Sequence, residues 1–467
     1  MTGHRSHWLT EALGDEQRHD DAPPLRGSAR ADVAIVGGGY VGLWTALRIK
    51  ELDPAADVAI LEADICGSGA SGRNGGFVLS WWPKLASLIA LCGKDEALRL
   101  VAASEQAIDE IETFAASEAP QAQMRRGGWL WTATSDAQLG AWNDVVALAE
   151  KLGSDAFVRL TPGEIRARSG SPQHLAGVLE RSGATVHPAY LARGLRRAAL
   201  ARGVRLFEHT KVTAIGRQSP SILHAGQGRL TADRVVIATN AWAVALRELR
   251  RHLFVISSDM IVTGPIPERL QEIGWTGGEA ITDSQTLVCY YRTTADGRIA
   301  FGKGGWAIAF GTHLPRAMER HRGRAAMVAR DFRRYYPMLH DVAVDNDWAG
   351  PIDRTGNSLP IFGHLAGCER IVYGVGWSGN GVGPSVVGGK ILASLALGRR
   401  DEWSQAGLVG AHARRFPPEP IRYLGAHVVR EAIVRKERSE ALGLAPNRVA
   451  VALASLAPSG LEDKTGA

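Results

Sequence analysis

A glycine-rich turn between two apolar runs near the N-terminus limits the possible folds of this chain more than any other feature. The first run ends at Gly37, and Gly39 and Gly42 follow it at the spacing G-x-G-x-x-G. Gly37 permits a tight turn, Gly39 lets a pyrophosphate approach the backbone, and Gly42 lets the next helix pack against the strand. The second run ends about twenty residues later at Glu62, whose carboxylate can accept hydrogen bonds from an adenosine ribose. The pattern therefore predicts a dinucleotide-binding strand–helix–strand unit, with its helix over residues 40–51, and leaves the dinucleotide open.

Length, charge and cysteine usage exclude several other classes of protein. A chain of 467 residues is too long for one simple core, so we expect two interleaved domains and an appendage. The formal net charge of +6 is mild and no Lys/Arg block is present, so no nucleic-acid partner is expected. The four cysteines form no C-x-x-C pair, which disfavours a disulfide framework or zinc site and favours a cytoplasmic location. No apolar stretch reaches the length of a membrane span, and the polar residues 1–30 do not resemble a secretory signal. We expect this first segment to lie on the surface, anchored by Trp8 and Leu9.

Two further glycine-rich loops follow predicted strands. The segment 71–76 reads SGRNGG, and its small residues would let backbone N–H groups approach a bound ring. The alternative for this segment is an exposed, flexible loop with a solvated arginine. The second loop covers residues 376–383 and precedes Pro384, which suits the first turn of a helix whose N–H groups can stabilise an anion. The alternative here is an ordinary strand–helix turn, which would not require four glycines.

Several downstream segments, taken with these loops, match one family. They are Ala238-Thr239-Asn240-Ala241-Trp242, Tyr290-Tyr291-Arg292, Phe301-Gly302-Lys303-Gly304-Gly305 and Gly376-Trp377-Ser378-Gly379-Asn380-Gly381. Over residues 30–400, and in this order, the chain resembles the D-amino-acid oxidase superfamily of FAD-dependent flavoenzymes. It looks most like the branch of glycine oxidase, sarcosine oxidase and γ-glutamylputrescine oxidase. The first motif alone is generic, whereas the whole set is specific.

The resemblance implies a fold that combines the α/β and α+β classes. A Rossmann-like FAD-binding domain would be interleaved with an antiparallel-sheet substrate domain, and a helical C-terminal extension would follow. The alternating pattern over 254–310 is typical of such a sheet, and an apolar helical stripe runs through 97–114. The expected division is an N-terminal surface segment (1–30), three segments of the FAD-binding domain (31–84, 166–250 and 341–400), a helical region of the substrate domain (85–165), its antiparallel sheet (251–340) and the C-terminal extension (401–467).

FAD is the cofactor that the resemblance implies. In the sarcosine oxidase branch a cysteine ahead of the late glycine loop attaches FAD, but the matching stretch 347–351 has none, so we expect non-covalent FAD. No metal-binding motif is present, and no metal is expected. The expected FAD-binding residues are Gly37, Gly38, Gly39, Gly42, Glu62, Ala63, Ser71, Arg73, Asn74, Gly75, Gly76, Thr239, Gly376, Gly379, Asn380, Gly381 and Val382. Arg73 and Asn74 would donate hydrogen bonds to flavin or pyrophosphate oxygens.

The resemblance also implies which residues surround the reacting amine. Because the cofactor performs the difficult step of amine oxidation, the protein mainly orients the substrate carbon. Tyr290 and Trp377 match positions near the flavin, although core packing is the alternative for each. Arg292 either holds a substrate carboxylate or pairs with a surface acid. Lys303 either points at the flavin or substrate or lies on the surface. The oxygen-activating lysine of the sarcosine oxidase branch is matched here by Ala300, so that role does not transfer directly to Lys303.

The expected activity is oxidation of a C–N bond in a small primary or secondary amine, such as an amino acid or polyamine derivative. The family reaction passes a hydride to flavin N5, and imine hydrolysis and reduction of O2 to H2O2 follow. One alternative is a dehydrogenase of the same fold that passes electrons to a quinone or an electron-transfer protein. Another is a flavin-binding assembly or scaffold protein without amine turnover. A third, a NAD-only dehydrogenase, is disfavoured by the two glycine loops. The expected partners are thus an amine and O2 or another electron acceptor.

Residues 401–467 extend beyond the resemblance. After the proline-rich stretch 416–420, apolar residues recur at helical spacing over 421–440, with arginines among them. A basic amphipathic helix can lie on an anionic membrane, but three glutamates dilute the charge of this one. We therefore favour packing of this helix against the protein itself or a partner subunit over peripheral membrane contact.

Overall fold

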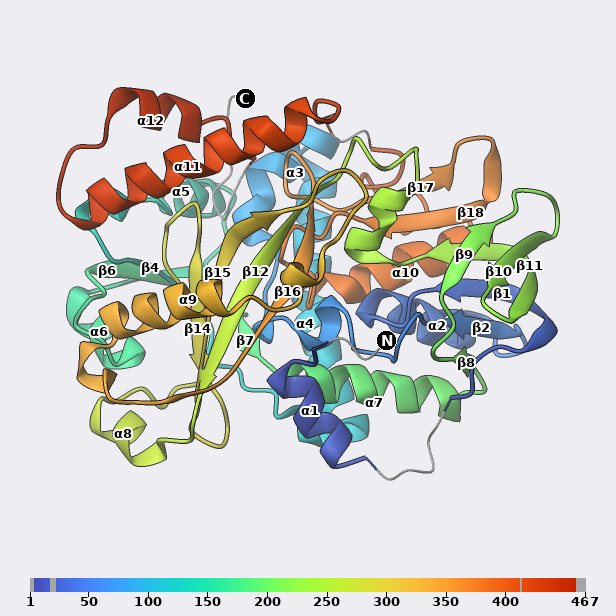
Figure 1. Cartoon of the computed structure of the whole chain (residues 1–467), viewed down its shortest axis with the longest axis horizontal. Helices are drawn as coiled ribbons and strands as arrows, with labels where there is room; N and C mark the ends of the chain where they lie inside the picture. The colour runs from blue at the N-terminus through green and yellow to red at the C-terminus, as the bar shows by residue number, and fades with distance from the viewer. Residues whose placement is uncertain (1–3, 17–21, 412–413, 459–467) are drawn as a thin grey trace.

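Two large β-sheets organise the molecule, one in each half of the view in Figure 1. The computed structural model describes residues 4–16, 22–411 and 414–458. Among these residues the α-helices are α1 His7–Gly14, α2 Tyr40–Leu52, α3 Leu85–Cys92, α4 Lys94–Glu118, α5 Asn143–Lys151, α6 Pro162–Ser169, α7 Pro188–Ala201, α8 Pro267–Glu272, α9 Arg322–Tyr335, α10 Pro384–Ala396, α11 Ile421–Ala441 and α12 Arg448–Ala454. The strands are β1 Gly27–Val36, β2 Val58–Leu61, β3 Phe77–Val78, β4 Trp129–Ala133, β5 Phe157–Leu160, β6 Ala176–Glu180, β7 Ala184–Thr185, β8 Arg205–Phe207, β9 Val212–Ile215, β10 Ser221–Ala225, β11 Gly228–Ile237, β12 Phe254–Thr263, β13 Ala280–Thr282, β14 Cys289–Thr293, β15 Ile299–Ile308, β16 Val344–Arg354, β17 Ile361–Leu365 and β18 Cys368–Val375.

The first sheet contains the predicted strand–helix–strand unit. Its strands follow the order β17-β18-β11-β1-β2-β8, and all neighbours from β18 to β8 are parallel. The inner part of β1 is apolar and buried, as expected for a strand that has neighbours on both sides and helices over one face. The connecting helix α2 packs against α7 and α10. Its observed span confirms the predicted helix, and Pro384 occupies the first position of α10 as expected.

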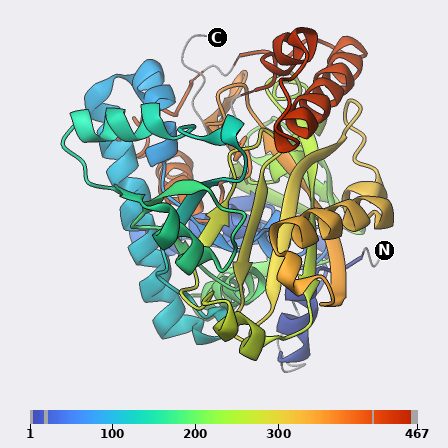
Figure 2. The ribbon, with the colours of Figure 1, turned by 90° about the vertical axis from the view of Figure 1, so that its left-hand side faces the viewer.

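The second sheet is largely antiparallel and confirms the strands predicted over 254–310. Its order is β16-β12-β15-β14-β13-β4-β6-β5, and only β13 and β4 pair in parallel. Helix α9 packs on β12 and β15. Beneath it the rings of Tyr291 and Phe301 stack with centroids 4.8 Å apart. In Figure 2 the sheet is seen from the side, with α9 in front of its strands and α11 and α12 above them.

Four strands differ from the sequence-based expectation. Two of them, β4 and β5, lie in the region 85–165 that was expected to be helical, and β6 comes next in the chain. All three join the second sheet. β4 is buried at every position, so it shows no alternation that would distinguish it from a helix. β16 pairs with β12 along most of its length, so residues 344–354 lie in the second sheet rather than the first.

The C-terminal segment forms the predicted helix over 421–441 and a second, shorter helix. α11 packs against β15, and α12 folds back on α11 at the upper left of Figure 1. Ala432 and Ile433 of α11 are buried, whereas Ile421 and Leu424 are exposed. One face of the helix therefore packs on the protein itself, as favoured from the sequence. None of the helices in the described parts of the chain is long and apolar enough to cross a membrane.

Candidate active site

The fingerprint turn has the close backbone approaches that its glycines predict. Gly37 has a φ of +111°, and a Cβ there would lie 2.5 Å from the carbonyl oxygen of Ala238 on the neighbouring strand. A Cβ at Gly42 would lie 2.0 Å from the carbonyl oxygen of Gly37. Neither position accepts a side chain without moving the backbone. The N-terminus of α2 is thus held close to the end of β1, as an anion-binding turn requires.

Glu62 holds the same turn from the end of β2. One of its carboxylate oxygens accepts a hydrogen bond from the backbone N–H of Gly38 at 2.7 Å, and the other accepts one from Asp64 N–H at 3.0 Å. Burial raises the pKa of this carboxyl group, although both N–H donors act in the opposite direction. Glu62 also lines the cavity described below, so its remaining lone pairs can accept hydrogen bonds from a ribose.

The side chains of the first glycine loop are engaged by the loop itself. Ser71 Oγ accepts a hydrogen bond from the backbone N–H of Tyr40 at 2.9 Å, which joins the loop to the first residue of α2. Asn74 Oδ1 accepts one from Gly76 N–H at 2.7 Å. Arg73 donates to the carbonyl oxygens of Ser68 at 2.8 Å and of Ala349 at 3.0 Å. Asn74 Nδ2 donates to the carbonyl oxygens of Ala70 and Ser71, both at 3.0 Å, so the hydrogen bonds that Arg73 and Asn74 donate in this structure hold the loop, while both residues also line the cavity described below.

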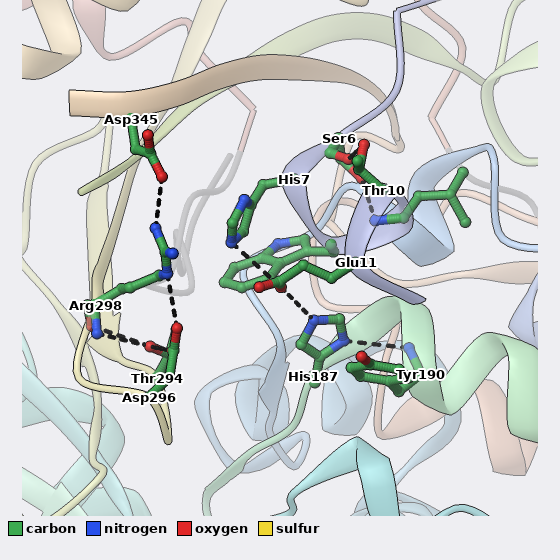
Figure 3. Close-up of polar contacts among 12 residues, drawn as sticks. Ser6, His7, Thr10, Glu11, His187, Tyr190, Thr294, Asp296, Arg298 and Asp345 are labelled. Carbon is green, nitrogen blue, oxygen red and sulfur yellow. Dashed lines mark hydrogen bonds and ion pairs between the residues drawn. The ribbon is translucent and has the colours of Figure 1, made fainter. Parts of the chain in front are cut away.

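Helix α1 packs against this first glycine loop, a contact that the sequence did not predict. Trp8, which is fully buried as expected for an anchor, donates from Nε1 to the carbonyl oxygen of Asn74 at 3.1 Å. Glu11 lies between two imidazoles, 3.2 Å from His7 Nε2 and 3.1 Å from His187 Nε2 (Figure 3). Because His187 caps the N-terminus of α7, these contacts join α1, the loop and α7 into one support.

The late glycine loop is held by an aspartate that no sequence motif indicated. Asp353, at the end of β16, accepts hydrogen bonds from the backbone N–H groups of Gly376 at 2.5 Å and Trp377 at 3.1 Å. Asn240 Nδ2 donates to the same carboxylate at 3.2 Å. Burial raises the pKa of Asp353 to about 7, and the two backbone donors partly oppose this rise. The loop is tied to the first glycine region through Asn380, whose Nδ2 donates to the carbonyl oxygen of Ser80 at 3.0 Å.

One cavity of about 1700 Å³ connects the fingerprint, both glycine loops and the second sheet. Sites for one small molecule typically measure roughly 300–1,000 Å³, so this cavity can hold a dinucleotide together with a substrate. Among the described residues that line it there is no cysteine. The predicted FAD-binding residues that line it are Gly37, Gly39, Glu62, Ala63, Ser71, Arg73, Asn74, Gly75, Thr239, Gly379, Asn380, Gly381 and Val382. The other four, Gly38, Gly42, Gly76 and Gly376, shape the adjoining turns.

Two of the four predicted catalytic residues line the cavity. Tyr290 shares a hydrogen bond of 2.7 Å with Ser258 Oγ, and its ring lies so close to Gly75 that a Cβ there would be 3.0 Å away. Burial raises the pKa of its phenol, which therefore stays protonated. Trp377 is 5% exposed and packs its indole ring against Phe362. Tyr290 thus connects the first glycine loop to the second sheet, and Trp377 brings the late glycine loop to the same cavity.

Arg292 and Lys303, in contrast, do not line the cavity. Arg292 Nε donates to the carbonyl oxygen of Gly75 at 2.7 Å, and its guanidinium lies 5.2 Å from the ring centre of Trp8. It therefore supports the first glycine loop and is not placed to hold a substrate carboxylate. Lys303 Nζ lies 3.1 Å from a carboxylate oxygen of Asp331 on α9. Successive residues of a strand face opposite sides of the sheet. Gly304 lines the cavity, so its neighbour Lys303 lies on the other face, toward α9.

Comparison with known proteins agrees with this geometry. Residues 32–395 match the model of a family described as FAD dependent oxidoreductase. γ-Glutamylputrescine oxidoreductase of Escherichia coli (strain K12) is 30% identical over 401 residues, which cover 85% of this chain and 90% of that protein. Glycine oxidase of Bacillus licheniformis is 23% identical over 398 residues, covering 81% and 96% of the two chains. The solved structure of glycine oxidase from Geobacillus kaustophilus has the same fold, with a TM-score of 0.66 at 22% identity over 80% of this chain and 96% of that one.

Proposed function

The chain belongs to the family of FAD-dependent oxidoreductases, and from this premise we propose that it oxidises a C–N bond of a small primary or secondary amine. The observation that carries the proposal is the convergence of both glycine loops and Tyr290 on one cavity. The similarity to proteins named γ-glutamylputrescine oxidoreductase and glycine oxidase supports an amine as the substrate class. An amino acid or a polyamine derivative fits that class.

The residues around the cavity fit FAD. Glu62 and the turn before α2 suit the adenosine and pyrophosphate, because they combine a ribose acceptor with a helix N-terminus that lacks side chains. Gly75 and the loop 376–383 suit the ring system. Bound FAD supplies the acceptor for the hydride that leaves the substrate carbon. We propose that FAD is held without a covalent bond, since no described lining residue is a cysteine.

The chain itself orients the amine and excludes water. The half-buried Tyr290 and the buried Trp377 line the cavity, and the Tyr290–Ser258 pair offers one polar anchor. The buried carboxylate of Asp353 is already bonded to Gly376 and Trp377, so it is not free to bind an ammonium group. Oxidation requires the neutral amine, because that form can lose a hydride from its α-carbon. The resulting imine is hydrolysed to a carbonyl compound and an amine or ammonia.

The electron acceptor divides this proposal into two candidates. We propose O2, with H2O2 as product, by analogy with the relatives named oxidases. The competing candidate is a dehydrogenase that uses a quinone or an electron-transfer protein. One observation favours it: Ala300 occupies the position of the oxygen-activating lysine, and Lys303 is engaged by Asp331.

Anaerobic absorbance spectroscopy of the purified flavoprotein tests the proposal. Glycine, sarcosine, putrescine and γ-glutamylputrescine are added separately, with 1,4-butanediol as a control that lacks nitrogen. We expect at least one amine to bleach the flavin bands and the diol to leave them unchanged. If air then restores the spectrum and yields peroxide, the acceptor is O2, whereas slow recovery without peroxide indicates the dehydrogenase. Persistence of the yellow colour with every amine would contradict the proposal and favour a flavin-binding scaffold.

A further inference from the structure

Part of the cavity wall lies outside the family match. The match ends at residue 395, but residues of the segment 414–458 also line the cavity. The lining residues from α11 include Val429, Arg430 and Ile433. The described residues of this segment that line the cavity include four arginines and no carboxylate.

Hydrogen bonds fasten this wall to residues next to the strand ends of the second sheet. Glu419 accepts a bond from Gly311 N–H at 3.0 Å, and Arg422 donates to the carbonyl oxygen of Leu253 at 3.0 Å. Farther along α11, a carboxylate oxygen of Glu437 accepts a bond from Leu287 N–H at 3.0 Å. Since Leu287 itself lines the cavity, the extension is held in a defined position over the site.

Arg430 is the partly buried arginine of this wall for which the described part of the structure shows no ion pair, whereas Arg414 and Arg415 are exposed. Its Nη1 donates to the carbonyl oxygen of Trp306 at 2.7 Å, while its buried Nε has no hydrogen-bond partner. Within the described chain no carboxylate lies within ion-pair distance of it, in contrast to Arg422, which pairs with Glu419 at 2.6 Å. A guanidinium that lines a cavity and has no carboxylate partner of its own is suited to bind a carboxylate.

We propose that Arg430 binds a carboxylate of the substrate, and that the substrate is an amine whose carboxylate lies several bonds from the oxidised carbon. Tyr290 pairs with Gly302 across β14 and β15, and Trp306 follows Gly302 by four residues. Four residues of strand span about 13 Å, so the carboxylate site lies on the order of 10 Å from Tyr290. With the oxidised carbon beside Tyr290, an α-amino acid cannot span this distance, whereas an ω-amino carboxylic acid can. That the other end of the substrate is an amine rests on the proposed amine oxidation.

The test compares three variants at two arginines of α11 in the full-length flavoprotein. Arg430→Gln removes the proposed site, and Arg435→Gln removes an arginine whose side chain is 74% exposed and pairs with Glu431. The substrates are 6-aminohexanoate and its uncharged amide. We expect R430Q to lower kcat/KM for the carboxylate about 10- to 100-fold, mainly through KM, and to change the amide less than threefold. R435Q should change neither, and Arg430→Lys should retain part of the preference for the carboxylate.

A binding measurement separates this inference from the proposed function. Hexanoate, which cannot be oxidised as an amine, is titrated calorimetrically into the wild type and the three variants. We expect R430Q alone to weaken hexanoate binding about 10-fold or more. Loss of hexanoate binding in R430Q without bleaching of the flavin by any amine would support the carboxylate site and contradict amine oxidation. Equal losses for acid and amide, or unchanged hexanoate binding in R430Q, would overturn the assignment of Arg430 even if amines are oxidised.

Discussion

Replacement of Gly72 by alanine should weaken FAD binding, although Gly72 itself does not line the cavity. An added Cβ would lie 2.1 Å from the carbonyl oxygen of Gly67, a backbone atom that cannot rotate away. Relieving this contact requires a shift of about 1 Å between the two ends of the loop, and overpacking of this kind typically costs about 1–3 kcal/mol. The empty loop can relax, but bound FAD requires the original geometry, so the strain appears in the binding free energy. The expected loss of affinity is therefore about 5- to 150-fold.

The apoprotein is titrated with FAD, and binding is measured by the quenching of flavin fluorescence. Gly163→Ala is the matched control, because nothing lies within 4 Å of a Cβ at this position in α6. Alanine should be neutral or slightly stabilising there, by up to about 1 kcal/mol. Wild-type FAD affinity in G72A, or an equal loss of affinity in both variants, would refute the steric reasoning.

Three further predictions concern stability and turnover. Burial raises the pKa of Glu437 from 4.5 to about 7. Between these two pH values the unfolded chain loses the proton that the folded protein keeps. The contribution of this group to the free energy of unfolding therefore falls as pH rises from about 4.5 to 7. Glu437→Gln keeps an acceptor for Leu287 N–H but removes this pH dependence. Thermal unfolding measured from pH 4.5 to 7 should show the free energy of unfolding of the variant rising by on the order of 3 kcal/mol relative to wild type. Parallel plots of stability against pH for the two proteins would count against the pKa shift. Trp8→Phe removes the bond to Asn74 and should cost about 1–3 kcal/mol in urea unfolding, with weaker FAD retention; an unchanged midpoint would show that α1 does not support the loop. Tyr290→Phe should leave FAD affinity unchanged and lower kcat/KM about 10-fold for an amine that bleaches the flavin, and loss of the cofactor instead would assign Tyr290 to FAD binding.

Local patterns in the sequence were sufficient to predict the glycine turns beside the cavity. Turn geometry at Gly37 and Gly42 depends on residues close in sequence and on the absence of a side chain, and both positions have the backbone contacts that this predicts. The helices and strands that follow regular periodicity, such as α2 and β15, were likewise predictable. The fully buried strand β4 was not, since its uniform apolarity carries no period.

The direction of single side chains depended on long-range pairing and was not predictable. Arg292 and Lys303 occupy the expected strands, but strand register turns one toward Trp8 and the other toward Asp331. Asp353 holds the late glycine loop from a strand more than twenty residues earlier, and no motif marks it. The contribution of α11 to the cavity was not predictable either, because helical periodicity shows that one face of a helix is buried but does not show which part of the protein covers it.

A single-turnover experiment under nitrogen tests the central claim, that this chain uses FAD to oxidise an amine C–N bond. The flavoprotein is mixed with one equivalent of an amine from the panel, the reduced flavin is measured by absorbance, and the products are identified by mass spectrometry. The account predicts one equivalent of carbonyl compound, together with ammonia or an amine, for each equivalent of flavin reduced. Reduction of the flavin without a carbonyl product, or no reduction by any amine of the panel, would contradict it.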